Sequence, residues 1–207
     1  MRHQRRPQLA FAGLAALLLA GCSQPVRVDS SWHGEPIPQP SERIMVVAVT
    51  SDLNGRRQFE DLLVQKLASS GNSAWASSRK MDTSAPLDRD MVSRAVADTG
   101  ATLVVVTRLA HRELEIGKTG EAGSVKVQRR HETPMDFFRY DYEITEAQTY
   151  LVPTSTVGLS TDVYSTDDAG LVYTIDTLIP PRESRLEIMS EAAEAISRRL
   201  RRDGLVR

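Results

Sequence analysis

The chain has 207 residues and a single cysteine, so it cannot form an internal disulfide bond. Its formal net charge is −1. Residues 1–21 hold three of the 26 basic residues and no acidic one, which leaves 23 basic and 27 acidic residues in the rest, a net charge of −4. A mildly acidic chain lacks the basic surface of a general nucleic-acid-binding protein, and we expect no nucleic-acid partner.

The N-terminus is typical of a secretory signal peptide. Arg2, Arg5 and Arg6 come first, without an acidic residue, and an almost unbroken apolar run follows over residues 9–20. A run of about a dozen residues is too short to span a membrane. We therefore interpret residues 1–21 as a signal peptide rather than a buried core helix.

The end of the apolar run, Leu19-Ala20-Gly21-Cys22, resembles the lipobox of bacterial lipoprotein signal peptides. The resemblance implies cleavage between Gly21 and Cys22, a diacylglycerol on the Cys22 thiol and a fatty acyl group such as palmitate on the new amine. The small residues Ala20 and Gly21 suit the pocket of a signal peptidase. Only the thiol of Cys22 supplies the nucleophile that receives the diacylglyceryl group. Several acyl chains on one residue give durable membrane attachment. By the family rule, Ser23 in place of Asp implies the outer membrane, and we expect the domain to face the periplasm.

Residues 22–42 form the next segment, with Cys22 followed by four prolines and little apolar content. This composition predicts an extended tether that buries no core. Trp32 is the one residue of this segment that could dock on another surface; a solvent-exposed aromatic side chain is the alternative.

From residue 43 to residue 109 the pattern predicts a β-α-β-α-β order. The apolar runs 43–50 and 102–109 are typical of buried strands, with a short strand at 73–77 between them. The first helix has Phe59, Leu62, Leu63 and Leu67 at helical spacing and Gly71 placed to end it. The second has Asp88 as cap, Met91, Val92, Ala95 and Val96 inward and Gly100 at its end.

The second half predicts an antiparallel meander and a closing helix. Residues 138–144 and 157–163 alternate apolar and polar side chains, and a turn at 167–170 leads to a further strand. Ser184 and Glu187 form a capping box, and the helix they open has an apolar stripe. That stripe is expected to contain Leu186, Met189, Ala193, Ile196 and Leu200, with Gly204 ending the helix before a last short strand at 205–206.

These elements predict an α/β (α+β) fold for residues 43–207: one domain with a mixed sheet, a β-α-β-α-β start, an antiparallel meander and a C-terminal helix. The stretches RIMVVAV, VADTGATLVVV, VYSTDDAGLVYTIDT and RRDGLV resemble those of small bacterial envelope lipoproteins of largely unknown function. The domain of these proteins is similar to the periplasmic domain of penicillin-binding-protein activator lipoproteins. None of these stretches is a catalytic signature, so the resemblance supports an assignment of the fold better than an assignment of the function.

No catalytic motif appears in the sequence. Metal-ligand residue types gather in two nearby stretches, His111, Glu113 and Glu115 and then His131 and Glu132. A metal site would need three or four of them to converge, and the alternating charged residues of a wet strand end give the same pattern. We expect no metal, no cofactor and no enzymatic activity.

Two groups of cationic residues are candidates for partner binding. The first lies in the glycine-containing stretch 117–134 and consists of Lys126, Arg129, Arg130 and His131. This stretch is interpreted as either an exposed hairpin or a partner-binding loop. The second group, Arg198, Arg199, Arg201 and Arg202, ends the last helix, where cations complement the helix dipole or meet an anionic partner.

Three functions follow from these features. The first is a non-enzymatic, lipid-anchored envelope lipoprotein that binds another envelope protein. The second is a self-assembling structural component of the envelope, and the third is a cell-wall hydrolase. The sequence leaves the oligomeric state and the identity of the partner open.

Overall fold

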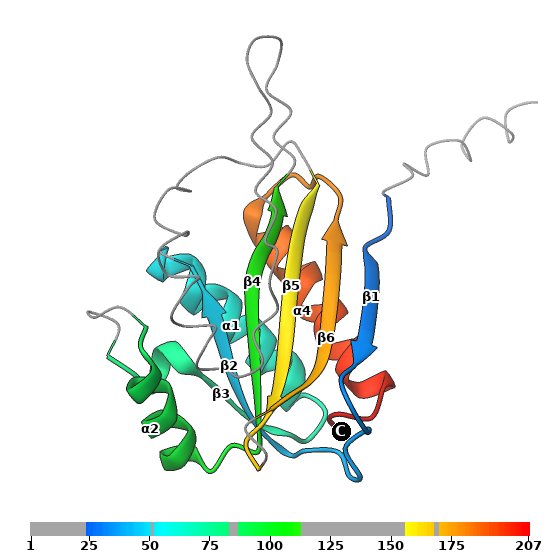
Figure 1. Cartoon of the computed structure of the whole chain (residues 1–207). Helices are drawn as coiled ribbons and strands as arrows, with labels where there is room; N and C mark the ends of the chain where they lie inside the picture. The colour runs from blue at the N-terminus through cyan, green and yellow to red at the C-terminus, as the bar shows by residue number, and fades with distance from the viewer. Residues whose placement is uncertain (1–23, 51, 83–86, 113–155, 168–169) are drawn as a thin grey trace, which may run out of the picture.

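The computed structural model describes residues 24–50, 52–82, 87–112, 156–167 and 170–207. A six-stranded mixed sheet, with strands in the order β1-β6-β5-β4-β2-β3, carries helices on both faces (Figure 1). This architecture confirms the predicted fold class, a single mixed α/β domain with a C-terminal helix. The predicted strand at 138–144 lies outside the described residues.

The parallel half of the sheet follows the predicted β-α-β-α-β order. It consists of β2 (Arg43–Val49), α1 (Leu53–Ala68), β3 (Ser73–Ala76), α2 (Arg89–Thr99) and β4 (Leu103–Arg112), with the short 3-10 helix η1 (Ser77–Arg79) after β3. Strand β2 lies between β3 and β4 and is parallel to both. The chain therefore crosses the sheet once on each face, through α1 and then through α2.

Side-chain caps fix where these two helices begin. The Asp52 carboxylate accepts hydrogen bonds from the backbone of Asn54 and Gly55 at the start of α1, and Asp88 accepts one from Met91 at the start of α2. Gly100 ends α2 with a left-handed backbone (φ +60°), as predicted. Gly71 does not end α1, because the helix ends at Ala68 with Ser69 as its C-cap, and Gly71 lies in the turn that follows.

The antiparallel half is built from β5 (Val157–Ser165) and β6 (Leu171–Ile179), and α4 (Arg185–Arg202) follows it. Strand β5 pairs antiparallel with β4 on one side and with β6 on the other. Sequence alternation predicts a wet face for β5, but both faces of the strand are buried. Tyr164 packs into the core next to α2, and Asp162 pairs with Arg108 of β4. The face of β5 that was expected to contact water therefore contacts other protein groups.

The predicted tether is wrong for much of its length. Residues Arg27–Trp32 form β1, an edge strand paired antiparallel with β6 over all six of its residues. Val26, Val28, Trp32 and Ile37 are partly buried against the main core. Main-chain hydrogen bonds to an open sheet edge order this segment despite its prolines, which lie outside the strand. The fold therefore begins before residue 43.

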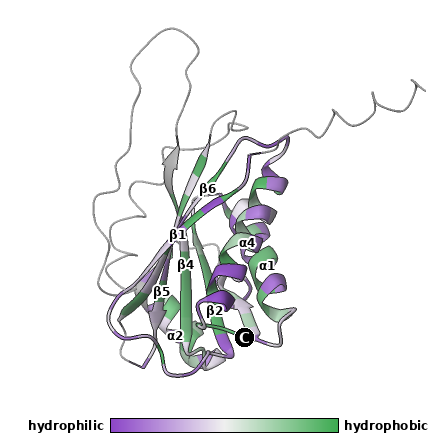
Figure 2. Cartoon of the chain, turned by 90° about the vertical axis from the view of Figure 1, so that its right-hand side faces the viewer, coloured by the Kyte–Doolittle hydropathy of each residue, from purple (hydrophilic) through white to green (hydrophobic). Residues whose placement is uncertain are grey.

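Two hydrophobic cores lie on opposite faces of the sheet. Helices α1 and α4 pack together on one face, over the side chains that include Ile44, Val105 and Ile175, and α2 covers the other face over Met45 and Val47. Figure 2 shows these helix layers on either side of the apolar central strands. The predicted stripe of α4 is confirmed for Met189, Ala193, Ile196 and Leu200, all buried.

Leu186 is the exception to that stripe, with 51% of its surface exposed. It lies in the first turn of α4, one residue after the helix begins. At the other end of this helix, Leu205 and Val206 are buried, and Val206 makes a parallel bridge to Ser41, where a last short strand was predicted.

Candidate functional site

The lipidation site Cys22 and the cleavage position Gly21 lie outside the described residues. The chain can be followed from Gln24, whose carbonyl accepts a hydrogen bond of 2.8 Å from Nη2 of Arg182. Nε of Arg182 also donates to both carboxylate oxygens of Glu191 in α4, at 2.9 and 3.0 Å. The hydrogen bond from Arg182 to Glu191 raises the pKa of the arginine. The described chain is thus bound to the domain from Gln24 onward.

Trp32 docks on its own domain, which was one of the two alternatives left by the sequence. Its ring lies edge-on to the ring of Tyr173, with centroids 4.8 Å apart. The Tyr173 hydroxyl lies 2.6 Å from Oγ of Ser30 and also bonds the carboxylate of Asp203, the residue that ends α4. Nε of Arg199 donates to the same carboxylate at 2.7 Å. Strands β1 and β6 are therefore joined to the C-terminal helix by one polar cluster.

The arginines at the end of α4 have partners within the chain. Arg198 pairs with Glu194, and Arg199 and Arg202 both approach Asp203. Arg201 donates to the carbonyl of Lys66 and to Oγ of Ser70, at the last turn of α1. Such cations satisfy carbonyl groups that a helix end leaves free. These contacts favour the structural interpretation of the group over an anionic partner.

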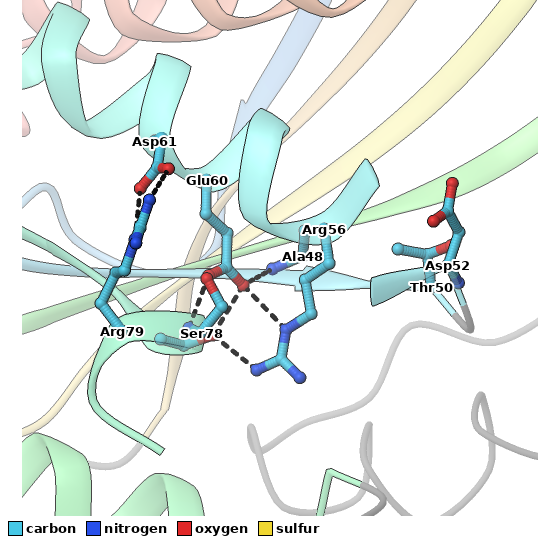
Figure 3. A network of polar contacts seen from close by, with 9 residues as sticks. Ala48, Thr50, Asp52, Arg56, Glu60, Asp61, Ser78 and Arg79 are labelled. Carbon is cyan, nitrogen blue, oxygen red and sulfur yellow. Dashed lines mark hydrogen bonds and ion pairs between the residues drawn. The ribbon is translucent and has the colours of Figure 1, made fainter. Parts of the chain in front are cut away.

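A buried polar network centres on Glu60 of α1 (Figure 3). Its carboxylate accepts from the backbone N–H groups of Ala48 (2.9 Å) and Ser78 (2.7 Å) and from the hydroxyl of Ser77 (2.6 Å). Nε of Arg56 donates to it at 3.1 Å, and the guanidinium also reaches Ser77 Oγ. Glu60 is fully buried, and its hydrogen bonds join α1 to β2 and η1.

A second buried ion pair crosses from β4 to β5, where Nη1 of Arg108 lies 2.8 Å from Oδ2 of Asp162. In the part of the chain that the structure describes, Glu60 and Asp162 are the two buried carboxylates, and each is paired with a buried arginine. A buried charge without a partner costs several kcal/mol, so each pair constrains the two elements that carry it to stay in contact. We assign both pairs a structural role.

The other predicted site residues fall outside the described residues or lie apart. Lys126, Arg129, Arg130 and His131 are outside them, as are Glu113, Glu115 and Glu132. His111 lies near the end of β4, opposite Gly158 of β5. Among the described residues, no three His, Cys, Asp or Glu side chains are grouped as metal ligands. None of the described helices is long and apolar enough to cross a membrane.

Comparisons with known proteins give the chain no family. No protein-family model and no curated protein matches it. Two solved structures of PelC from Paraburkholderia phytofirmans, one of them a variant and both dodecamers, align with 88% of this chain and 99–100% of theirs. They are 10% identical in sequence, with TM-scores of 0.47 and 0.46. At this level the likeness assigns neither function nor oligomeric state, and the resemblance to penicillin-binding-protein activators stays a prediction from the sequence.

Proposed function

We propose that this chain is a non-enzymatic envelope lipoprotein, held in the membrane by acyl chains on Cys22, that binds another envelope protein. One observation carries the proposal: a lipobox cysteine lies five residues before the first strand of the sheet, β1, which begins at Arg27. An acylated Cys22 would fix the whole domain at a lipid surface. Ser23 directs the anchor to the outer membrane, with the domain in the periplasm.

Two features support a protein as the partner. Strands β1 and β3 are the outer strands of the sheet, and an outer strand can accept a strand from another chain through main-chain hydrogen bonds. The cationic residues Lys126, Arg129, Arg130 and His131 suit an acidic partner, because charged groups chiefly steer association and set specificity. No metal or cofactor enters the proposal.

The sheet edges also keep self-assembly as the second candidate function. Edge-to-edge pairing of copies would use the same outer strands. The mass of the acylated protein in detergent separates the two functions: a monomer supports partner binding, and a defined ring or filament supports assembly. The hydrolase stays the third candidate, and no contact described above favours it.

Crosslinking and affinity capture from intact cells test the partner directly. A variant with Lys126, Arg129, Arg130 and His131 replaced by Gln should capture less of an acidic partner than the wild type, and the loss should be larger at low salt, where charges are less screened. A matched control replaces four exposed cationic residues elsewhere, Arg57, Arg79, Lys80 and Arg94. Equal capture by wild type and the first variant would exclude this group as the binding surface.

A further inference from the structure

Large apolar side chains are exposed at only one end of the domain in the described part of the chain. There are four of them, and between 38% and 51% of each is exposed: Leu53, Leu109, Leu178 and Leu186. Single exposed leucines are common on protein surfaces and need no explanation, but a group of them at one place marks a contact surface. We call this end, defined by the four residues, the leucine end.

The topology places the four leucines at the same end of the domain, although Leu178 lies on the sheet face opposite Ile175 and Ile179, which belong to the main core. Strands β4 and β6 both run antiparallel to β5, so their C-terminal ends, with Leu109 and Leu178, lie at the same edge of the sheet. Strand β2 is parallel to β4 and leads directly into α1, whose first residue is Leu53. Leu186 follows the end of β6, in the first turn of α4. In Figure 1 this is the end to which the arrowheads of β4 and β6 point, opposite the C-terminus.

An ion pair holds the two helix starts side by side. Nη1 of Arg185 lies 2.5 Å from Oδ2 of Asp52, the N-cap of α1. Leu53 and Leu186 are the residues that directly follow this pair in the two helices. The two most exposed leucines therefore lie beside a contact that fixes the helices against each other.

The chain that leads to Cys22 enters the domain at the same end. Arg27, the first residue of β1, is the register partner of Leu178. The Gln24 carbonyl is bonded by Arg182, four residues before Leu186. Cys22 is two residues before Gln24, and two extended residues span at most about 7 Å. An acyl anchor on Cys22 is thus confined near the leucine end.

Among the described residues of this end, basic and acidic side chains are mixed and form no basic patch. Exposed Arg27 and Arg185 are accompanied by exposed Glu183 and Glu187, and Arg185 is already paired with Asp52. Attraction to anionic lipid grows with an excess of basic residues. Contact with a lipid surface here would therefore rest on the apolar side chains and on the anchor.

From this geometry we infer that the leucine end lies against the lipid leaflet that holds the Cys22 acyl chains. The inference rests on the proposed lipid attachment. The surface fits a lipid leaflet rather than a protein partner, because the anchor is too close to let the domain turn this end away from the membrane. The opposite end, where β3 begins at Ser73, then points into the aqueous compartment.

Single introduced cysteines test the orientation, since acylation leaves Cys22 without a free thiol. Leu186→Cys and Leu53→Cys are made in the full chain, with Ser73→Cys, an exposed site at the opposite end, as the control. Each acylated protein is labelled with an environment-sensitive fluorophore and placed in vesicles of phosphatidylethanolamine and phosphatidylglycerol. We expect lipid-borne nitroxide to quench the labels at Leu186 and Leu53, and aqueous iodide to quench the label at Ser73. Unchanged melting of each variant checks the fold.

The outcomes separate this inference from the function on which it rests. If the protein floats with the vesicles but all three labels are equally open to iodide, the membrane-facing end is wrong and lipid attachment stands. If the protein does not float with the vesicles, both are wrong. Vesicles of phosphatidylethanolamine and phosphatidylcholine should give the same protection at Leu186, and loss of protection there would overturn the apolar contact.

Discussion

Trp32 of β1 and Tyr173 of β6 are register partners, and their rings meet edge-on with the planes at 63°. The same tyrosine carries a hydroxyl bonded to Asp203, after the last turn of α4. One aromatic side chain thus joins the segment that follows Cys22 to the end of the C-terminal helix. A part of the chain that would pass for a linker by composition belongs to the packed domain.

Trp32→Ala should lower the free energy of unfolding by about 1–3 kcal/mol, because a half-buried aromatic contact is lost. Urea denaturation of wild type and variant gives the difference. Glu35→Ala, an exposed position in the same segment, is the control and should change stability by less than about 0.5 kcal/mol. Equal stability of the Trp32 variant and wild type would show that the packing of this segment does not stabilise the domain, as expected for a free tether.

Leu200 and Leu186 form a matched pair in α4, with 0% and 51% of their surfaces exposed. Leu200→Ala leaves a cavity in the main core and should cost about 2–5 kcal/mol. Leu186→Ala removes the same atoms from the surface and should cost less than about 0.5 kcal/mol. Thermal or urea unfolding of the two variants compares them, and similar losses for both would show that the helix is placed in the wrong phase.

Glu60→Gln should be strongly destabilising, because it leaves the Arg56 guanidinium buried without a counter-charge. Breaking a buried pair from one side costs about 3–5 kcal/mol. The double variant Arg56→Met, Glu60→Gln should recover part of that loss, since the stranded charge is gone. Asp61→Asn breaks the neighbouring pair with Arg79, which is exposed and screened by water, and should cost far less than Glu60→Gln. A double variant less stable than Glu60→Gln would contradict this assignment.

The Asp52 carboxylate should contribute to stability in a pH-dependent way. Burial raises its pKa, but hydrogen bonds from Gly55, Arg185 and Asn54 outweigh this and bring the pKa below the ordinary 3.8. A carboxylate whose pKa is lower in the folded state stabilises the fold above its unfolded pKa and loses that effect as the pH falls through the folded value. The stability difference between wild type and Asp52→Asn should therefore shrink between pH 6 and pH 3. A difference that stays constant over this range would contradict the lowered pKa.

Much of the fold could be predicted from periodicity and caps. The apolar runs of β2 and β4, the helical spacing in α1 and the caps Asp88 and Ser184 are local signals in the sequence. The Asp52 cap of α1 was not predicted and is seen only in the structure. Strand β1 was missed because the prolines on either side of it dominate the composition of residues 22–42, although the strand itself has Val28 and Trp32 on one face, as an edge strand does. Leu186 was misplaced because periodicity gives the phase of a helix but not how far the sheet beneath it extends.

The site could be predicted only in part. The lipobox is a contiguous motif, so lipidation at Cys22 can be predicted from the sequence alone, and it stays a prediction because Cys22 lies outside the described residues. The Glu60 network and the Arg182 contact with Gln24 join residues far apart in the chain, and no local pattern marks them. The leucine end is likewise a product of topology, because four separate elements bring one leucine each to the same edge.

Intact-mass spectrometry of the mature protein, purified from membranes, tests lipid attachment at Cys22. We expect a chain that begins at Cys22 and carries a diacylglyceryl group on the thiol and a fatty acyl group on the amine. Cys22→Ser should give only the uncleaved precursor without either group. A wild-type chain that retains residues 1–21, or one with a free Cys22 thiol, would rule out lipid attachment.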